Sequence, residues 1–174
     1  YNGYKAYDSH GVQLLPDAAR DVADRARAVD DYLSPPGEPK AAVEYVDAAV
    51  DESYVRRVLD LVNGIAGALA PREARAAFGL IYTPLHGTGH VFVPRVLHEL
   101  GFGSAQVVAE QSVPDGAFPT VKYPNPEDPG AFEMAIAQAH NSGGPRPEII
   151  LATDPDCDRV GVAVWDRAAE SYRV

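Results

Sequence analysis

The sequence predicts an α/β fold in which a mostly parallel (mixed) sheet lies between two layers of helices. After Pro71, short apolar runs alternate with segments of helical periodicity, and this alternation is typical of three-layer α/β/α domains. Hydrophobic residues make up 46% of the 174 residues, which is enough for one complete core and part of another. Pro and Gly occur 15 times each without a repeat period, so turns are frequent. We therefore expect one or two folded domains.

Turn residues and helical periodicity define the elements that precede this alternating region. Residues 4–7 and 12–15 predict a hairpin, because the intervening sequence DSHG favours a turn. Residues 16–33 predict a helix with proline in its first turn, since apolar residues recur there at intervals of three and four. The sequence SPPGEP at residues 34–39 stops this helix and predicts a linker, and residues 51–69 predict a second helix.

Strands and helices follow one another in the alternating region. The run at residues 148–152 is rich in Ile and Leu, as expected for a buried central strand. Asp128 and Pro129 fit the N-cap and the first turn of a helix. The expected strands cover residues 78–82, 105–109, 148–152 and 160–165, and the expected helices cover residues 91–100 and 131–140.

Charge and apolar-run length argue against nucleic-acid and membrane partners. The formal net charge is -10 at pH 7, so the overall field repels nucleic acid, and an anion site would need local groups or a bound cation. The longest apolar candidate, residues 55–69, is interrupted by Arg56, Arg57 and Asp60 and falls short of the roughly 20 apolar residues that cross a bilayer. The single cysteine, Cys157, suits the reducing cytoplasm, where we expect the protein to act.

The chemistry of the chain is concentrated in the sequence DPDCDR at residues 154–159, directly after the predicted buried strand. Its aspartates, Asp154, Asp156 and Asp158, stand at alternate positions, and Mg²⁺ is usually held by a few carboxylates plus a phosphate oxygen. Ligands of open α/β sheets bind at the carboxyl ends of strands, so the position favours a metal site over a solvated acidic turn. For Arg159, spacing alone leaves open contact with a phosphate and a structural ion pair.

A calcium-sensor loop is disfavoured by two positions of the same segment. Such a loop needs Gly at its sixth position and Glu at its twelfth. Counted from Asp154, these positions hold Arg159 and Trp165, so both requirements fail.

A second motif, TPLHGTG at residues 83–89, lies between the first predicted strand and the next helix. Free backbone amides and the helix dipole favour an anion or a polar ligand at such a turn. The motif matches neither the dinucleotide fingerprint nor the Walker A pattern, so no nucleotide site is predicted. From the residues alone, a capping or packing role of His86 is favoured over ligand binding. The proline-rich residues 115–127 predict an extended surface loop.

Together, four ordered segments closely resemble the α-D-phosphohexomutases, in particular their phosphoglucomutase and phosphomannomutase branch. The segments are NGYKAY at residues 2–7, TPLHGTG at residues 83–89, FPTVKYPNPE at residues 118–127 and DPDCDR at residues 154–159. The resemblance covers nearly the whole chain, but only a minority of the usual four-domain length of that family. It implies that residues 1–42 are the C-terminal part of a first domain, and that residues 43–174 are the second α/β domain, ending in the metal loop and the following strand.

The resemblance also implies a role for each matching site residue. Asp154, Asp156 and Asp158 would hold Mg²⁺ together with a phosphoserine. Arg159, His86 and Thr88 would contact the phosphate of the substrate. Lys5, the lysine of NGYK, would be the general acid/base, because a lysine near other cations or partly buried can reach a useful pKa.

The implied reaction interconverts hexose 1-phosphate and hexose 6-phosphate by two phosphoryl transfers. A phosphoserine gives its phosphate to the sugar phosphate, and glucose or mannose 1,6-bisphosphate is the intermediate and the primer. The partners would be the hexose phosphate and the remaining domains of the parent chain. In the family the phosphoserine lies in a Ser-His-Asn-Pro loop just before NGYK, and this sequence begins at Tyr1. We therefore expect the chain alone to be inactive.

Two alternatives from other functional classes stay open on sequence grounds. One is a non-catalytic module that binds a metal or another protein. The other is a D-x-D aspartyl-phosphate phosphatase, in which Asp154 would be the nucleophile and no serine would be needed.

Overall fold

The computed structural model describes residues 5–30, 33, 45–46, 48–65 and 70–174. The chain divides into two compact units, Tyr1–Tyr45 and Val46–Val174. The assignment of residues 1–42 and 43–174 to two domains of a longer protein stays a prediction. Within the described residues, no helix combines the length and the apolar character needed to cross a bilayer.

Where the sequence predicts a hairpin, the described residues of the first unit form a turn closed by a single bridge. Tyr7 and Gln13 form an antiparallel bridge. Between them, the carboxylate of Asp8 accepts hydrogen bonds from the amides of His10 at 2.8 Å and Val12 at 3.0 Å, which is how an aspartate stabilises a turn. Tyr4, the first residue of the predicted hairpin, lies outside the described residues.

The helix of the first unit, α1 (Pro16–Arg27), begins where it was predicted but ends six residues early. Two aspartates, Asp30 and Asp31, follow its last turn in the sequence. Negative charge near a helix C-terminus is unfavourable because it opposes the helix dipole. None of the described residues of α1 is buried, so no packing offsets this cost. The linker predicted at residues 34–39 lies outside the described residues.

The second unit is built on a five-stranded mixed sheet of order β2-β1-β3-β4-β5. The parallel strands are β1 (Leu80–Thr83), β2 (Gln106–Val107) and β3 (Ile149–Thr153). Strand β4 (Val160–Asp166) pairs antiparallel with β3, and β5 (Ser171–Arg173) pairs antiparallel with β4. Strand β3 occupies the centre, as predicted. The α/β fold with a mixed sheet is therefore confirmed.

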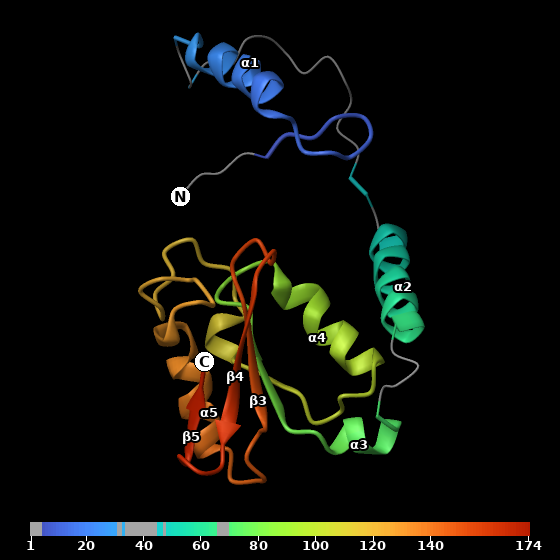
Figure 1. Cartoon of the computed structure of the whole chain (residues 1–174), viewed down its shortest axis with the longest axis vertical. Coiled ribbons are helices and arrows are strands. Elements are labelled where there is room, and N and C mark those ends of the chain that lie inside the picture. The colour runs from blue at the N-terminus through green and yellow to red at the C-terminus, as the bar shows by residue number, and fades with distance from the viewer. Residues whose placement is uncertain (1–4, 31–32, 34–44, 47, 66–69) are drawn as a thin grey trace. The chain divides into compact units, whose positions relative to one another are not determined.

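Helices lie on both sides of this sheet (Figure 1). On one side α4 packs against α2, through an edge-to-face contact between Tyr54 and Phe92 and an ion pair of 2.6 Å between Arg95 and Glu52. On the other side lie α5 and the short 3-10 helix η2. The bounds are α2 (Ala48–Ile65), α3 (Arg72–Ala77), α4 (Gly89–Glu99), η1 (Ala109–Gln111), η2 (Pro129–Phe132) and α5 (Glu133–Asn141).

Most predicted elements of the second unit are present with shifted ends. Helix α2 begins three residues before the predicted position, and residues 66–69 of that prediction lie outside the described part of the chain. The predicted helix at residues 131–140 is divided into η2 and α5, and Asp128 caps η2 by accepting the amide of Gly130 at 2.9 Å. Helix α3 and strand β5 were not predicted, because segments of six and three residues are too short to show a period.

The main core lies between the sheet and the side covered by η2 and α5. Alternate residues of the strands point into it, as expected for strands with one face on a core. On the opposite face of β4, Val160, Val162 and Val164 are exposed. The fully buried members of the core include Ile81, Leu85, Val108, Phe132, Ala135, Ile150, Ala152 and Ala163.

The register of the sheet positions two loops side by side. Thr83 at the end of β1 pairs with Ala152 in β3, and the two strands are parallel. The segments that follow them, residues 84–88 and 154–159, therefore leave the same edge of the sheet. This edge is the carboxyl edge, where open α/β sheets bind ligands.

We predict that Phe132→Ala destabilises the second unit by about 3–5 kcal/mol, because it removes a completely buried aromatic ring from the core. Urea unfolding measures the change. Val162→Thr is the matched control: it keeps a β-branched side chain at a position that is 42% exposed, and its expected effect is about 0.5 kcal/mol or less. Equal effects of the two substitutions would contradict this assignment of the core.

Candidate metal centre

The loop of residues 154–159, called the aspartate loop below, joins β3 to β4. Its turn is closed by the amide of Cys157, which donates to the carbonyl oxygen of Asp154 at 2.9 Å. Cys157 has a φ angle of 61°, in the left-handed region that few non-glycine residues adopt. Such backbone strain persists only where surrounding contacts hold it. Here the conformation is held by the hydrogen bonds of Asp154 within the loop and by those from Thr88 to Pro155.

Asp154 is the buried anchor of the aspartate loop. Its side chain is 1% exposed. One carboxylate oxygen, Oδ1, accepts the amides of Asp158 at 3.1 Å and Arg159 at 3.0 Å, and the other, Oδ2, accepts Nε of Arg159 at 2.8 Å. A carboxylate offers about four lone-pair sites, so these three bonds leave room for one further ligand.

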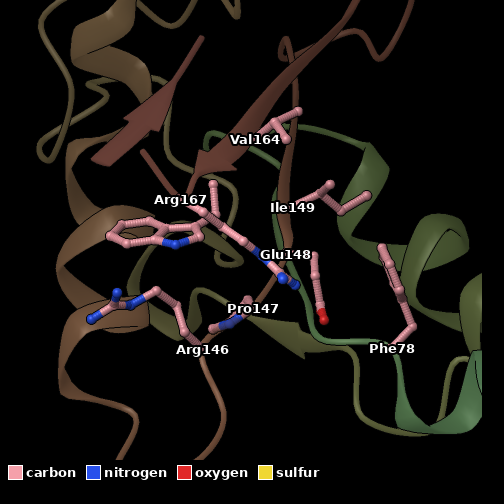
Figure 2. Close-up of a pocket in the computed structure, with 8 residues that line it drawn as sticks. Phe78, Arg146, Pro147, Glu148, Ile149, Val164 and Arg167 are labelled. Carbon is pink, nitrogen blue, oxygen red and sulfur yellow. The ribbon is translucent and has the colours of Figure 1, made fainter. Parts of the chain in front are cut away.

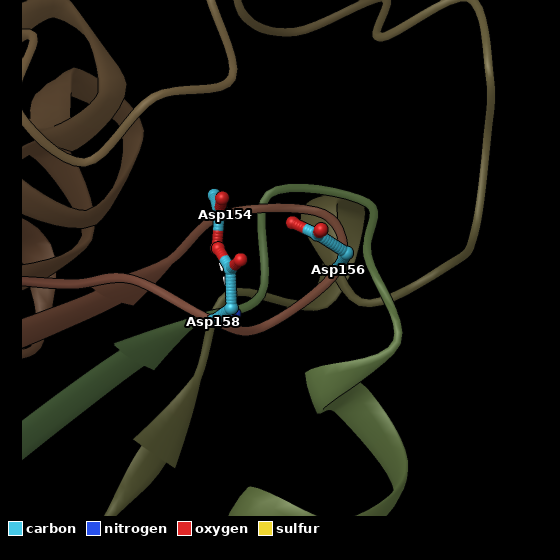
Figure 3. A group of neighbouring side chains, drawn as sticks. All are labelled: Asp154, Asp156 and Asp158. Carbon is cyan, nitrogen blue, oxygen red and sulfur yellow. Dashed lines mark hydrogen bonds between the residues drawn. The ribbon is translucent and has the colours of Figure 1, made fainter. Parts of the chain in front are cut away.

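The three aspartates bring their carboxylates together. One oxygen from each of Asp154, Asp156 and Asp158 lies within 4.8 Å of the others, and in Figure 3 the carboxylate of Asp156 points toward the other two. Ligand oxygens of an octahedral Mg²⁺ are about 3 Å apart when adjacent and about 4.2 Å apart when opposite. Rotation of the exposed side chains of Asp156 and Asp158 toward the buried Asp154 would bring the three oxygens into this range, and carboxylate oxygens fit a hard divalent cation.

Arg159 is the cation of the aspartate loop. Besides its bond to Asp154, its Nε lies 3.8 Å from Asp158, and about half of its side chain is exposed. The hydrogen bond to Asp154 raises the pKa of Arg159 above its ordinary value, so its charge is permanent. The structural ion pair considered for Arg159 is present, and the exposed part of the side chain leaves contact with a phosphate open as well.

His86 is buried, and both of its ring nitrogens are used inside the protein. Nδ1 lies 2.9 Å from the carbonyl oxygen of Val113, and because a carbonyl only accepts, Nδ1 carries the proton. Nε2 then accepts the hydroxyl of Thr120 at 2.8 Å. The packing role favoured from the residues alone is thus present. Binding of a phosphate by His86 would require one of these bonds to break.

The contacts of His86 belong to a longer network that sequence analysis did not identify. Thr83 donates to Oε1 of Gln111 at 2.6 Å, and Nε2 of Gln111 donates to Thr120 at 3.0 Å. The network ties residues 111–120 to the end of β1. Thr83 and Thr120 lie inside the motifs TPLHGTG and FPTVKYPNPE, so the motifs could have indicated these two members of the network. Nothing in the sequence distinguishes Gln111 as the third member.

Thr88 and Lys5 complete the set of predicted site residues. Thr88 is exposed, and its amide and hydroxyl both donate to the carbonyl oxygen of Pro155, at 2.9 Å and 3.2 Å. It is thus in direct contact with the aspartate loop. Lys5 is an exposed residue of the first unit, and its predicted role stays a prediction.

A separate pocket of about 460 Å³ lies at the other end of β3 and β4 (Figure 2). The guanidinium of Arg146 stacks 3.9 Å from the ring centre of Trp165, and Glu148 accepts the amide of Gly79 at 2.9 Å. Two of its polar groups are thus engaged within the protein. The described residues that line it, none of them a predicted site residue, are Phe78, Arg146, Pro147, Glu148, Ile149, Val164, Trp165 and Arg167.

Comparison with known proteins gives consistent matches. The family model described as "Phosphoglucomutase/phosphomannomutase, alpha/beta/alpha domain II" matches residues 52–167, which include the aspartate loop. A phosphoglucomutase of Staphylococcus saprophyticus is 36% identical over 167 residues, covering 92% of this chain and 28% of the relative. A protein of Haemophilus influenzae named "Probable phosphomannomutase" is 36% identical over 171 residues, covering 95% of this chain and 32% of the relative. The chain thus spans about three tenths of these relatives.

A solved structure agrees with the fold. The crystal structure of a phosphoglucomutase/phosphomannomutase family protein from Burkholderia thailandensis superposes with a TM-score of 0.57 at 24% sequence identity. The match covers 87% of this chain and 28% of that chain. At this identity, the similarity supports the α/β fold alone.

We predict that Asp154→Asn destabilises the second unit by about 1–3 kcal/mol in the presence of EDTA. The substitution keeps an acceptor for the two amides but places an NH₂ group opposite Nε of Arg159. Asp156→Asn, at an exposed position of the same loop, should change the free energy of unfolding by about 0.5 kcal/mol or less. Urea unfolding without metal separates the two, and equal stabilities would show that Asp154 is not the anchor.

Proposed function

Because this chain belongs to the phosphoglucomutase/phosphomannomutase family, we propose that it is part of a mutase that interconverts hexose 1-phosphate and hexose 6-phosphate. The observation that carries the proposal is the cluster of Asp154, Asp156 and Asp158 at the carboxyl edge of the sheet. The activity is assigned to the whole protein, since the chain spans about three tenths of its relatives. The chain alone is expected to be inactive, and a cytoplasmic location is part of the proposal.

In this proposal the three aspartates of the loop hold Mg²⁺. Asp154 would contribute through the lone-pair site that its protein donors leave available, while Asp156 and Asp158 contribute exposed carboxylates. When bound, Mg²⁺ supplies electrostatic stabilisation of the charge that develops on a transferring phosphoryl group. The permanent contacts of Asp154 keep the ligand set organised before the cation arrives.

The other residues of the chain would bind phosphate and move a proton. The exposed part of Arg159 would orient a phosphate of the substrate, since a guanidinium matches the geometry of phosphate oxygens. Lys5 would take the proton from the sugar hydroxyl that attacks in the first phosphoryl transfer and give a proton to the sugar oxygen that leaves in the second. His86 and Thr88 would also contact a phosphate. To do so, each would have to give up hydrogen bonds that it makes within the protein.

The reaction would proceed by two phosphoryl transfers through a hexose 1,6-bisphosphate. In the first, a phosphoserine supplied by the parent chain gives its phosphate to the free hydroxyl of the sugar phosphate. In the second, the serine takes the other phosphate back, so that the net reaction moves one phosphate between two carbons of glucose or mannose. Because phosphoryl transfer needs little covalent chemistry from the protein, positioning and charge stabilisation account for most of the catalysis.

The burial of Asp154 disfavours the aspartyl-phosphatase alternative. A nucleophilic aspartate must reach the phosphorus atom of its substrate, and Asp154 is 1% exposed with both oxygens accepting hydrogen bonds from the loop. A covalent phospho-aspartate at this position would therefore break the anchor of the loop. The alternative of a non-catalytic module that binds a metal or another protein is tested by the mutase assay of the parent protein, described next.

We predict that Asp156→Asn lowers kcat of the parent protein at least about 100-fold, because it removes one ligand of the cation that stabilises the transferring group. A Mg²⁺-dependent mutase assay with glucose 1-phosphate or mannose 1-phosphate, each with its 1,6-bisphosphate primer, measures the loss. Asp60→Asn is the matched control, since Asp60 is an exposed residue of α2. Full activity of Asp156→Asn, or full activity of the wild type in EDTA, would contradict the metal assignment.

We predict that Lys5→Met lowers kcat of the parent protein by about 10²–10⁴, the usual contribution of a general acid/base, with a smaller change in KM. Lys122→Met provides a control with the same chemical change at an exposed position of the second unit. A large rise in KM at unchanged kcat would assign Lys5 to substrate binding instead.

A further inference from the structure

The aspartate loop is held from outside by the segment of residues 83–89, here called the support loop. The amide and the hydroxyl of Thr88 both donate to the carbonyl oxygen of Pro155. In Figure 3 the green segment that leads into α4 runs alongside the loop that carries the three aspartates. The two loops therefore meet through bonds between residues 67 positions apart.

Thr88 makes this contact at the expense of its own helix. It is the N-cap residue of α4, yet with the residues that the structure describes its side chain makes no capping hydrogen bond. Threonine is favoured at this position because its hydroxyl can satisfy a free amide of the first turn. Here the hydroxyl serves the other loop, a local departure from helix preference of the kind that accompanies functional sites.

Two glycines of the support loop leave no room for a side chain. A Cβ atom at Gly87 would overlap the backbone of Pro155, and one at Gly89 would overlap the hydroxyl of Tyr82 and lie 3.0 Å from Sγ of Cys157. Backbone atoms of the two loops are thus in direct contact. The preceding residues, Leu85 and His86, both adopt positive φ angles of 47° and 62°, so the support loop reaches this position in a strained conformation.

These contacts act on the residue that precedes Asp156. Pro155 accepts both hydrogen bonds of Thr88, whereas the amide of Cys157, on the other side of Asp156, donates to Asp154 within the aspartate loop. Asp158 and Arg159 are likewise fixed by Asp154 from within the aspartate loop. The aspartate loop therefore has an inner support, Asp154, and an outer support that acts on the chain directly before Asp156.

We infer that Gly87 and Thr88 are positioning residues that fix Asp156 for cation binding. The inference rests on the proposed function and deepens it, because it gives the support loop a role toward the cation in addition to the proposed phosphate contact. Neither residue touches the reacting atoms in this role. Each acts through Pro155: Thr88 donates to its carbonyl oxygen, and Gly87 leaves free the space in which a Cβ atom would overlap its backbone.

The experiment is a Mg²⁺ titration of the ¹⁵N-labelled chain, followed by the amide shifts of Asp156, Cys157 and Asp158. Thr88→Val keeps the shape of the side chain but removes the hydroxyl, and it should weaken Mg²⁺ binding by roughly three- to tenfold, the equivalent of one hydrogen bond. Gly87→Ala should weaken binding by about tenfold or more, because its Cβ displaces Pro155. The shifts of Asp156 and Cys157 without metal should change in both variants.

Two matched controls separate positioning from general stability. Thr88→Ser restores the hydroxyl and should restore the affinity for Mg²⁺. Gly116→Ala makes the same change as Gly87→Ala at a glycine whose Cβ would meet no atom within 4 Å, and it should bind Mg²⁺ as the wild type does. The core amide signals, for example those of Ile150 and Ala163 in the sheet, report whether each variant is folded.

The outcomes distinguish this inference from the proposed function. Wild-type affinity in both Thr88→Val and Gly87→Ala would overturn the positioning role and leave the metal site intact. If the wild-type chain itself binds no Mg²⁺ at millimolar concentrations, the metal site fails and the positioning role fails with it. Loss of affinity in Thr88→Val that Thr88→Ser does not restore would also overturn the inference, since the hydroxyl would then not be the cause.

Discussion

The buried carboxylate of Asp154 is the interaction on which the candidate site depends. Asp154 directly follows β3 in the chain. Its carboxylate accepts hydrogen bonds from the backbone amides of Asp158 and Arg159, which directly precede β4. The carboxylate therefore closes the connection between two antiparallel strands. A buried carboxylate without donors would cost several kcal/mol, so the side chain of Asp154 and the loop conformation stabilise each other. One side chain thus serves as structural anchor and as candidate metal ligand.

The parallel pairing of β1 and β3 adds the second support. Because parallel strands end at the same edge, the pairing of Thr83 with Ala152 brings together motifs that are far apart in the sequence. Antiparallel pairing of these strands would have sent the two loops to opposite edges. The contact between Thr88 and Pro155 then needs only the absence of side chains at the neighbouring glycines. The parallel pairing of β1 and β3 and the glycines on either side of Thr88 thus both favour direct contact between the two loops.

The sequence predicts those features of the chain that local patterns encode. Central β3, strand β4 and the Asp128 cap follow from apolar runs and turn chemistry, and the metal-ligand candidates follow from alternate spacing. Strand β5 depends instead on tertiary contacts, since Tyr172 packs on Trp165 and donates to the carbonyl oxygen of Pro147. The bonds of His86 to Val113 and Thr120 span 27 and 34 positions. No periodicity reveals such partners, because they are set by how the loops fold onto the sheet.

In the proposed mutase, a bound cation would also reduce the negative charge of the aspartate loop. The whole chain carries a formal charge of -10, and the aspartate loop contains three carboxylates and one guanidinium, that of Arg159, which pairs with Asp154 and Asp158. A phosphorylated sugar would meet repulsion at such a surface. A bound divalent ion would offset the excess negative charge of the loop and leave the exposed part of Arg159 able to attract a phosphate. Binding of the cation before the anionic substrate is therefore the order that the electrostatics of this loop favour.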